Sequence, residues 1–160
     1  MKGSCVLFSK ASDAWGTPAT VFRPLLARYR FTVDGAADAA NHLLPRWYGP
    51  GGLREDALHG SWRGERVWCN PPYSRCREFL DKAVEEAIRH DVTSVLLIPA
   101  RTDTRYFQEC VWDEKTQAVY PWVRSLNFLR GRVKFVSADR IRQGSSNSAP
   151  FPSVVIEFGG

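Results

Sequence analysis

A tetrapeptide, Asn70-Pro71-Pro72-Tyr73, offers the clearest chemistry in this chain. The short run just before it, Arg66 to Cys69, reads as a buried strand. Two consecutive prolines fix two φ angles and remove two backbone donors, so we expect a stiff arch. The arch can present the Asn70 amide and unused carbonyl oxygens, while Tyr73 supplies a flat ring. Acceptors beside a ring are what a planar base with an exocyclic amine requires.

An acidic residue is expected in the same place. Residues 31–34 read as a short buried strand that ends in Asp34, and the small residues after it are expected to open a short helix. In sheets of parallel strands, ligands bind beyond the carboxyl ends of the strands. Asp34 and Asn70 should therefore share one crevice. Both also have a purely structural interpretation: Asp34 as a charge at a helix N-terminus, and Asn-Pro-Pro as an ordinary turn.

Helical and extended patterns alternate along the chain. Thr17 and Pro18 predict a helix start, with Thr17 as the N-cap and Pro18 as the first helical residue, and apolar residues continue at helical spacing to Tyr29. Ser74 is expected to cap a second helix whose apolar face runs to residue 88. The other expected elements are strands at 66–70, 94–98 and 154–158, a possible strand at 46–48, and a short helix beginning at Thr102 or Thr104.

The last third of the chain changes pattern. Residues 126–129 and 133–136 flank Arg130-Gly131-Arg132 and predict an antiparallel hairpin. Alternating strands and helices followed by a hairpin predict an α/β fold, with a mostly parallel sheet and an antiparallel C-terminal hairpin edge. Neither a repeat nor a linker divides the sequence, so residues 1–160 are expected to form a single domain.

Composition narrows the class of protein. The chain of 160 residues is 44% hydrophobic and 24% charged, which suits a folded core. A net charge of +5 favours a polyanionic partner, nucleic acid first. The four cysteines form no Cys-x-x-Cys pair and the three histidines lie apart, so we expect no metal site and reduced thiols in a cytoplasmic protein. The sequence lacks an apolar run long enough to span a membrane.

Several segments together resemble the amino-methylating DNA methyltransferases that use S-adenosylmethionine, and most closely the small phage-type Dam family of adenine methyltransferases. The resemblance runs from about Asp13 to Phe158 and includes Asn70 to Ser74 as the catalytic motif. It implies a compact Rossmann-like methyltransferase fold, and DNA, double-stranded or locally unpaired, as partner. The expected location is the cytoplasm of a bacterial host, with the protein encoded by a phage or prophage. The residues implied in cofactor binding are Trp15, Thr17, Pro18, Asp34, Ala36, Ala37, Asp56 and Leu58.

The chain departs from the pattern in the cofactor loop. Most such enzymes carry Gly-x-Gly where this chain has Gly35-Ala36-Ala37, and alanine does not adopt φ > 0 cheaply. The acid that usually holds the cofactor ribose has only a candidate by position, Glu55.

The implied chemistry is direct in-line methyl transfer to the exocyclic amine of a flipped-out adenine, without a metal. Asn70 and the Pro71 carbonyl would accept the amine hydrogens, Pro72 would stiffen the arch, and Tyr73 would stack on the base. Contacts with DNA are expected from Ser74, Arg101, Arg130, Arg132, Lys134, Arg140 and Arg142, although surface arginines are often only solvated.

Three other functions stay open from the sequence. An Asn-Pro-Pro-Tyr arch suits the amide of a protein glutamine equally well, although the altered loop and the lack of a recognition domain argue against it. Methylation of a cytosine amine is another possibility, with Asn70 fitting adenine better. A third interpretation is a nucleic-acid-binding relative that has lost the cofactor and does not catalyse.

Overall fold

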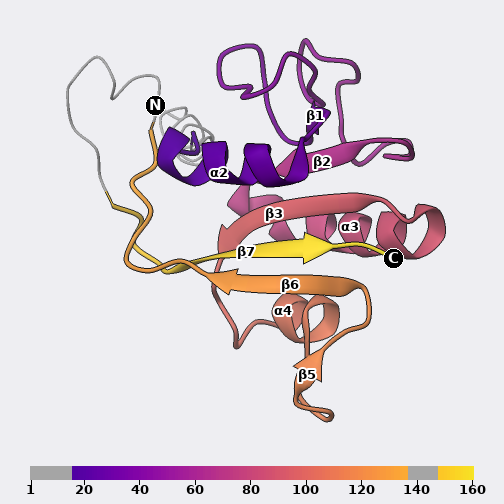
Figure 1. Cartoon of the computed structure of the whole chain (residues 1–160), viewed down its shortest axis with the longest axis vertical. Coiled ribbons are helices and arrows are strands. Elements are labelled where there is room, and N and C mark those ends of the chain that lie inside the picture. Colours follow the sequence, from indigo (N-terminus) through magenta and orange to yellow (C-terminus); the bar gives the residue numbers. More distant parts are fainter. Residues whose placement is uncertain (1–15, 137–147) are drawn as a thin grey trace, which may run out of the picture.

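The computed structural model describes residues 16–136 and 148–160. Helices and strands alternate along most of this part of the chain (Figure 1). The helices are α2 (Ala19–Tyr29), the 3-10 helix η1 (Tyr73–Arg75), α3 (Cys76–His90) and α4 (Arg105–Cys110). The strands are β1 (Val33–Asp34), β2 (Arg66–Cys69), β3 (Thr93–Pro99), β4 (Trp112–Asp113), β5 (Ala118–Val119), β6 (Val123–Phe128) and β7 (Ser153–Phe158).

Five strands form the main sheet, in the order β1-β2-β3-β7-β6. β1, β2 and β3 pair in parallel, β7 is antiparallel to β3, and β6 is antiparallel to β7. Four strands therefore run the same way, and β7 alone is reversed. The two short strands β4 and β5 form a separate antiparallel hairpin. The expected α/β fold with a mostly parallel sheet is confirmed.

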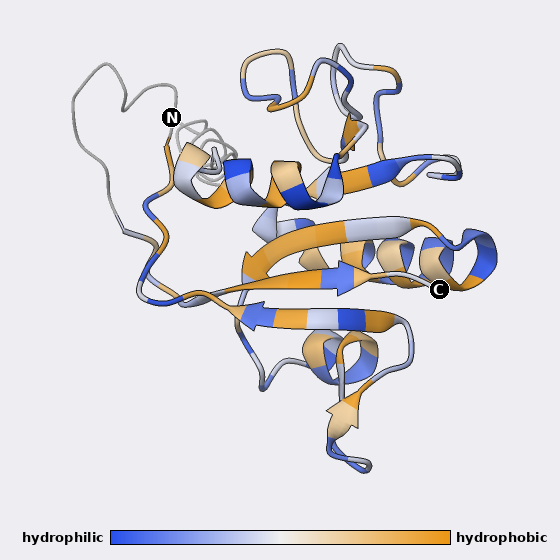
Figure 2. Cartoon of the chain, in the orientation of Figure 1, coloured by the Kyte–Doolittle hydropathy of each residue, from blue (hydrophilic) through white to orange (hydrophobic). Residues whose placement is uncertain are grey.

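Both faces of the central strands are buried, which explains why β3 is apolar from Val95 to Pro99. Leu96 and Ile98 pack in one cluster with residues of α3 and α4, whereas Val95 and Leu97 pack in a second cluster with Phe22 of α2. Residues 133–135 and 149–151 extend the second cluster. Figure 1 shows α2 in front of the sheet and α3 and α4 behind it, and Figure 2 shows the apolar strands between them.

The expected C-terminal hairpin is wrong. Residues 126–128 of β6 pair with Val154 to Ile156 of β7, not with residues 133–136. The latter make only isolated bridges, from Val136 to Gly16 and from Lys134 to Ser148. β7 is buried almost throughout its length, so pairing β6 with it completes the sheet over the core, and the reversed strand β7 lies inside the sheet and not at its edge.

Two helix starts also differ from expectation. α2 begins at Ala19, with the extended residue Pro18 as its N-cap, and Thr17 makes no capping bond because its hydroxyl bonds Asn70. α3 begins at Cys76, after the turn η1, so Ser74 is not its cap. Thr104 does precede α4, as one of the two alternatives predicted.

The residues after β1 form turns, not the expected helix. The Asp38 carboxylate accepts the N–H groups of Ala40 and Asn41, a local bond that competes with helix formation. Residues 46–48 lie beside β1, where the Arg46 carbonyl accepts the N–H of Asp34 at 2.9 Å and Tyr48 donates to the Asp34 carbonyl at 2.8 Å. The strand expected there is confirmed only as a parallel bridge of Trp47 to Asp34.

Helices long and apolar enough to cross a membrane are absent from residues 16–136 and 148–160.

Candidate active site

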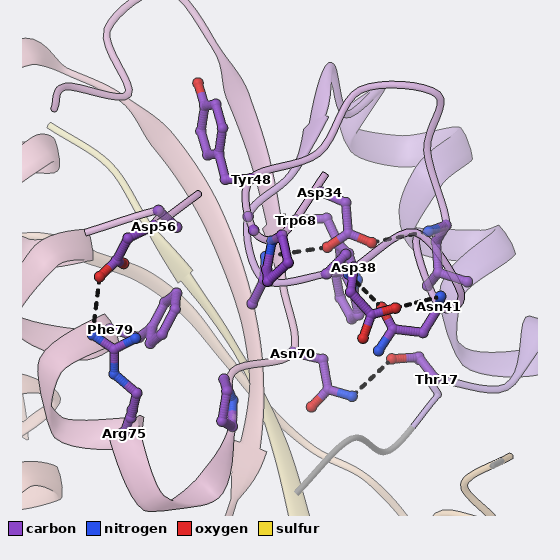
Figure 3. A pocket seen from close by; sticks show the side chains of 18 of the residues that line it. Thr17, Asp34, Asp38, Asn41, Tyr48, Asp56, Trp68, Asn70, Arg75 and Phe79 are labelled. Carbon is purple, nitrogen blue, oxygen red and sulfur yellow. Dashed lines mark hydrogen bonds and ion pairs between the residues drawn. The ribbon is translucent and has the colours of Figure 1, made fainter. Parts of the chain in front are cut away.

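A cleft opens at the carboxyl ends of β1 and β2, with about 920 Å³ of empty space that includes solvent at its mouth. The side chains that line it come from the loop after β1, the end of β2 and the start of α3 (Figure 3). Among the residues proposed from the sequence, the cleft is lined by Thr17, Asp34, Ala36, Ala37, Glu55, Asp56, Asn70 and Pro72.

Asn70 stands directly after β2, with its amide held by Thr17. Its Nδ2 donates to Thr17 Oγ1 at 3.2 Å, across 53 residues of sequence. Thr17 is buried and also lines the cleft. Figure 3 shows the two side chains pointing toward one another. The bond fixes the plane of the Asn70 amide, and that is the orientation a hydrogen-bond acceptor in a binding site must keep.

Asp34 organises the loop that follows it. Its carboxylate accepts the N–H of Ala36 at 3.3 Å and the N–H of Leu43 at 3.0 Å, and the side chain is only 2% exposed. Burial raises the pKa of the Asp34 carboxyl to about 6, while the two backbone N–H groups and nearby His42 act in the opposite direction. Asp34 thus gives the cleft a buried acid that holds two parts of one loop together.

Asp34→Asn should remove a pH dependence of stability. In the folded protein the carboxyl keeps its proton up to about pH 6, against an ordinary value of 3.8. The stabilising contribution is therefore complete below about pH 4 and is lost as the pH rises through about 6, because the folded state binds more protons in that window. The shift corresponds to about 3 kcal/mol. Urea unfolding from pH 4 to 7 should show a wild-type free energy of unfolding that falls relative to the variant, and parallel profiles would contradict this.

The Gly35-Ala36-Ala37 loop has no strained backbone. Ala36 and Ala37 are not among the described non-glycine residues with positive φ. Two glycines take the tight positions: a Cβ at Gly35 would crowd the Val67 side chain and the Trp68 carbonyl, and one at Gly49, where φ is 135°, would collide with the Ala37 carbonyl oxygen. Alanine is compatible with the loop conformation at positions 36 and 37.

The other end of the cleft contains a charged group of three residues. The Arg75 guanidinium lies 3.5 Å from an oxygen of Asp56 and 3.1 Å from one of Glu78. The Leu58 N–H donates to Asp56 at 2.9 Å, and this bond, followed by the charge of Arg75, lowers the pKa of Asp56. Phe79 of α3 also lines the cleft beside Arg75 (Figure 3). This end combines an ionised acid with an aromatic face.

The rest of the arch is less exposed to the cleft. Pro71 is buried, and neither it nor Tyr73 is among the lining residues. The Tyr73 ring packs edge-on against Phe151, with centroids 4.9 Å apart, and against Phe135 at 6.3 Å. Its expected stacking on a base stays a prediction.

The basic residues proposed from the sequence fall in different places. Arg130, Arg132 and Lys134 line a second hollow, together with Pro18 and Thr20 at the start of α2. Pro18 therefore faces this hollow and not the cleft, one residue beyond Thr17. Arg101 lies over the ring of Phe151, 5.8 Å from its centroid, and Ser74 is exposed. Leu58 is half-buried and packs against the core, while Trp15, Arg140 and Arg142 lie outside the described residues.

Sequence reasoning missed a number of lining residues. Asp38 and Asn41 bond each other's backbone N–H groups, and an Asp-x-x-Asn spacing after a strand was a usable signal. Phe79 had only the pattern of a core residue, because it is 3% exposed and belongs to the apolar face of α3. The others include Leu43, Tyr48, Gly49, Pro50, Trp68 and Arg75.

Comparison with known proteins identifies the family. Residues 5–158 match the family model described as DNA N-6-adenine-methyltransferase (Dam). The chain therefore belongs to the Dam family of adenine-specific DNA methyltransferases.

Two curated relatives carry the name DNA N-6-adenine-methyltransferase. The protein of Haemophilus phage HP1 (strain HP1c1) is 26% identical over 147 residues, which cover 91% of this chain and 79% of the relative. The protein of Escherichia phage T1 is 34% identical over 99 residues, which cover 61% of this chain and 40% of the relative. The HP1 protein thus matches nearly the whole chain, and the T1 protein a part of it.

Proposed function

We propose that this protein transfers a methyl group from S-adenosylmethionine to the exocyclic amine of adenine in DNA, in the cytoplasm of a bacterial host. The observation that carries the proposal is that Asn70 and the loop after Asp34 line one cleft, at the ends of neighbouring strands. Membership of the Dam family and the names of both phage relatives support it. The reversed β7 in a sheet of parallel strands is compatible with a Rossmann-like methyltransferase fold.

The cleft suits a ligand with an ammonium group at its amino-acid end, a positively charged sulfur and a flat purine. When bound, S-adenosylmethionine supplies an electrophilic methyl group on a positively charged sulfur. Four acidic side chains line the cleft, namely Asp34, Asp38, Glu55 and Asp56, against one lining cation, Arg75, which is paired with Asp56 and Glu78. We assign the amino-acid end to the loop at Asp34 to Asp38, with Thr17 beside it. The purine would lie between Asp56 and the ring of Phe79, with Leu58 supporting Asp56 from its N–H.

Asn70 has the central chemical role. An adenine amine is a poor nucleophile, since its lone pair is delocalised into the ring. The Asn70 side-chain oxygen and the Pro71 carbonyl would accept its two hydrogens, which favours a tetrahedral nitrogen with its lone pair directed at the methyl group. The N–C bond would form in line as the S–C bond breaks, and the methylated amine would release one proton to solvent. Alignment of the reacting atoms and fixed dipoles at the nitrogen would supply most of the rate gain.

DNA would approach over the arch. The target adenine must leave the duplex, because its amine is inaccessible within the base stack. Tyr73 would contact the extruded base, and Ser74 and Arg101 would contact the backbone near the arch. The hollow that contains Arg130, Arg132 and Lys134 begins one residue beyond Thr17, so a strand seated there would pass close to Asn70.

Methyl transfer can be tested by nucleoside mass spectrometry. We would incubate the protein with methyl-labelled S-adenosylmethionine and unmethylated duplex or single-stranded DNA, then digest the DNA to nucleosides. The expected product is labelled N6-methyladenine. Label in N4-methylcytosine would show that cytosine is the methyl acceptor, and label in added protein would favour glutamine-amide methylation. Absence of label from every acceptor would contradict the proposal.

A calorimetric titration with S-adenosylmethionine separates the enzyme from a binding relative that does not catalyse. We expect one site per chain, because the residues assigned to the cofactor line one cleft. DNA binding without cofactor binding would favour the non-catalytic relative.

A further inference from the structure

Glu86 is a buried acid on α3 to which the proposed mechanism assigns no role. Its side chain is 2% exposed, and its carboxylate lies 2.7 Å from the Lys82 ammonium. The Ser61 hydroxyl donates to it at 2.9 Å, and the Trp62 backbone N–H also bonds it. Three partners from two segments therefore converge on one buried carboxylate.

Trp62 links Glu86 to the wall of the cleft. Its ring has 0% exposure, and its indole N–H donates to the Ala57 carbonyl at 2.9 Å. Ala57 lines the cleft between Asp56 and the core, where it packs in one cluster with Trp62 and Leu80. Trp62 therefore fills the core behind the wall of the cleft, and its N–H also fixes the backbone of that wall at Ala57.

The same segment is tied to α3 at its other end. Arg75, at the start of α3, contacts Asp56, while Glu86 lies eleven residues further along the chain and holds Ser61 and Trp62. At 1.5 Å per residue, these two attachments are roughly 16 Å apart along the helix. α3 follows the Asn70 arch directly, so the attachments join the wall of the cleft to the helix that carries the arch.

A buried ion pair is an inefficient way to stabilise a fold, because desolvation of the charges offsets most of their attraction. A carboxylate with one cation and two directional donors does something an apolar residue cannot do, since it sets the position of a backbone segment. We infer that Trp62 and Glu86 are positioning residues that hold residues 55–57 against the cofactor, an inference that rests on the proposed function of the cleft.

The test compares two tryptophans that make the same bond. Trp62→Phe keeps a ring in the core but removes the N–H that holds Ala57. Trp122→Phe is the matched control, because the Trp122 indole N–H also donates to a backbone carbonyl, that of Cys110 at 2.8 Å, away from the cleft. Calorimetry with S-adenosylmethionine and steady-state kinetics with DNA would be run on both variants and on the wild type.

Trp62→Phe should weaken cofactor affinity at least threefold beyond the control, and raise the KM for cofactor equally. The kcat at saturating cofactor and the affinity for DNA should stay within twofold. A smaller loss, or an equal loss in both variants, would overturn the inference. Thermal melts would show whether Trp62→Phe folds; if it does not, Ser61→Ala decides by the same threefold criterion, because Ser61 is exposed and donates to Glu86.

The wild-type titration keeps this inference separate from the proposed function. Wild type that binds no S-adenosylmethionine would overturn both. Wild type that binds it, with Trp62→Phe binding equally well, would overturn only the assignment of Trp62 and Glu86.

Discussion

Asn70→Ala should reduce the rate of methyl transfer to DNA by about 100-fold or more, while affinity for S-adenosylmethionine changes by no more than a few-fold. Loss of one fixed polar group at the reacting atoms of an enzyme typically costs about 10²- to 10³-fold in kcat. Asn70 lines the cleft after β2, whereas the residues assigned to the cofactor are Thr17 and residues of the loops after β1 and near Asp56. Single-turnover transfer of labelled methyl groups and calorimetry would measure the two effects.

A graded variant and a control sharpen this experiment. Thr17→Val removes the hydroxyl that accepts the hydrogen bond from the Asn70 side-chain N–H. A neutral hydrogen bond is worth about 1 kcal/mol, so the rate of methyl transfer should fall about fivefold. Asn127 is exposed on β6, so Asn127→Ala should leave the rate unchanged. A large loss of cofactor binding in Asn70→Ala would mean that Asn70 holds the cofactor and does not act on the base.

Replacing Arg130, Arg132 and Lys134 together with Gln should weaken DNA binding tenfold or more, and should reduce its dependence on salt. Each side chain is exposed and makes no ion pair among the described residues. If each neutralises one phosphate, the slope of log K against log salt should fall by about 2.7 for a duplex. Fluorescence anisotropy with labelled DNA at several salt concentrations would measure it.

The matched control removes the same charge from paired side chains. Arg77, Arg89 and Arg105 lie on α3 and α4, and each contacts an acidic residue of its own helix or of the neighbouring helix. Their replacement with Gln should change the salt dependence of DNA binding little, because these three arginines do not line the hollow beside α2. An equal reduction in both triple variants would show that net charge, and not the hollow, determines DNA affinity.

The arrangement of the site was predictable where local chemistry was strong. Two prolines after an apolar strand predicted a sharp arch at Asn70, and the rule for parallel strands placed Asp34 in the same crevice. The structure brings both residues to one cleft. The buried central strand β3 was also predictable, since a continuous apolar run has only one environment that satisfies both of its faces.

Long-range pairing was not predictable in the same way. Residues 126–129 and 133–136 flank a turn signal, but β7 offered residues 126–128 a longer apolar partner from later in the chain. Thr17 had the spacing of a helix cap, yet its hydroxyl bonds a side chain 53 positions away. Phe79 and Trp62 look like core residues in sequence because they are core residues. Only the fold shows that the same side chains lie against or behind the cleft.

The position of β7 has a consequence for how the protein is made. β6 leaves the ribosome before β7, and its partner in the main sheet is β7. One edge of β3 also pairs with β7, so that edge has no partner until β7 has been synthesised. The nascent chain must therefore carry two unpaired strand edges until residues 153–158 have been translated, which is the period when strands are most prone to pair with a neighbouring molecule.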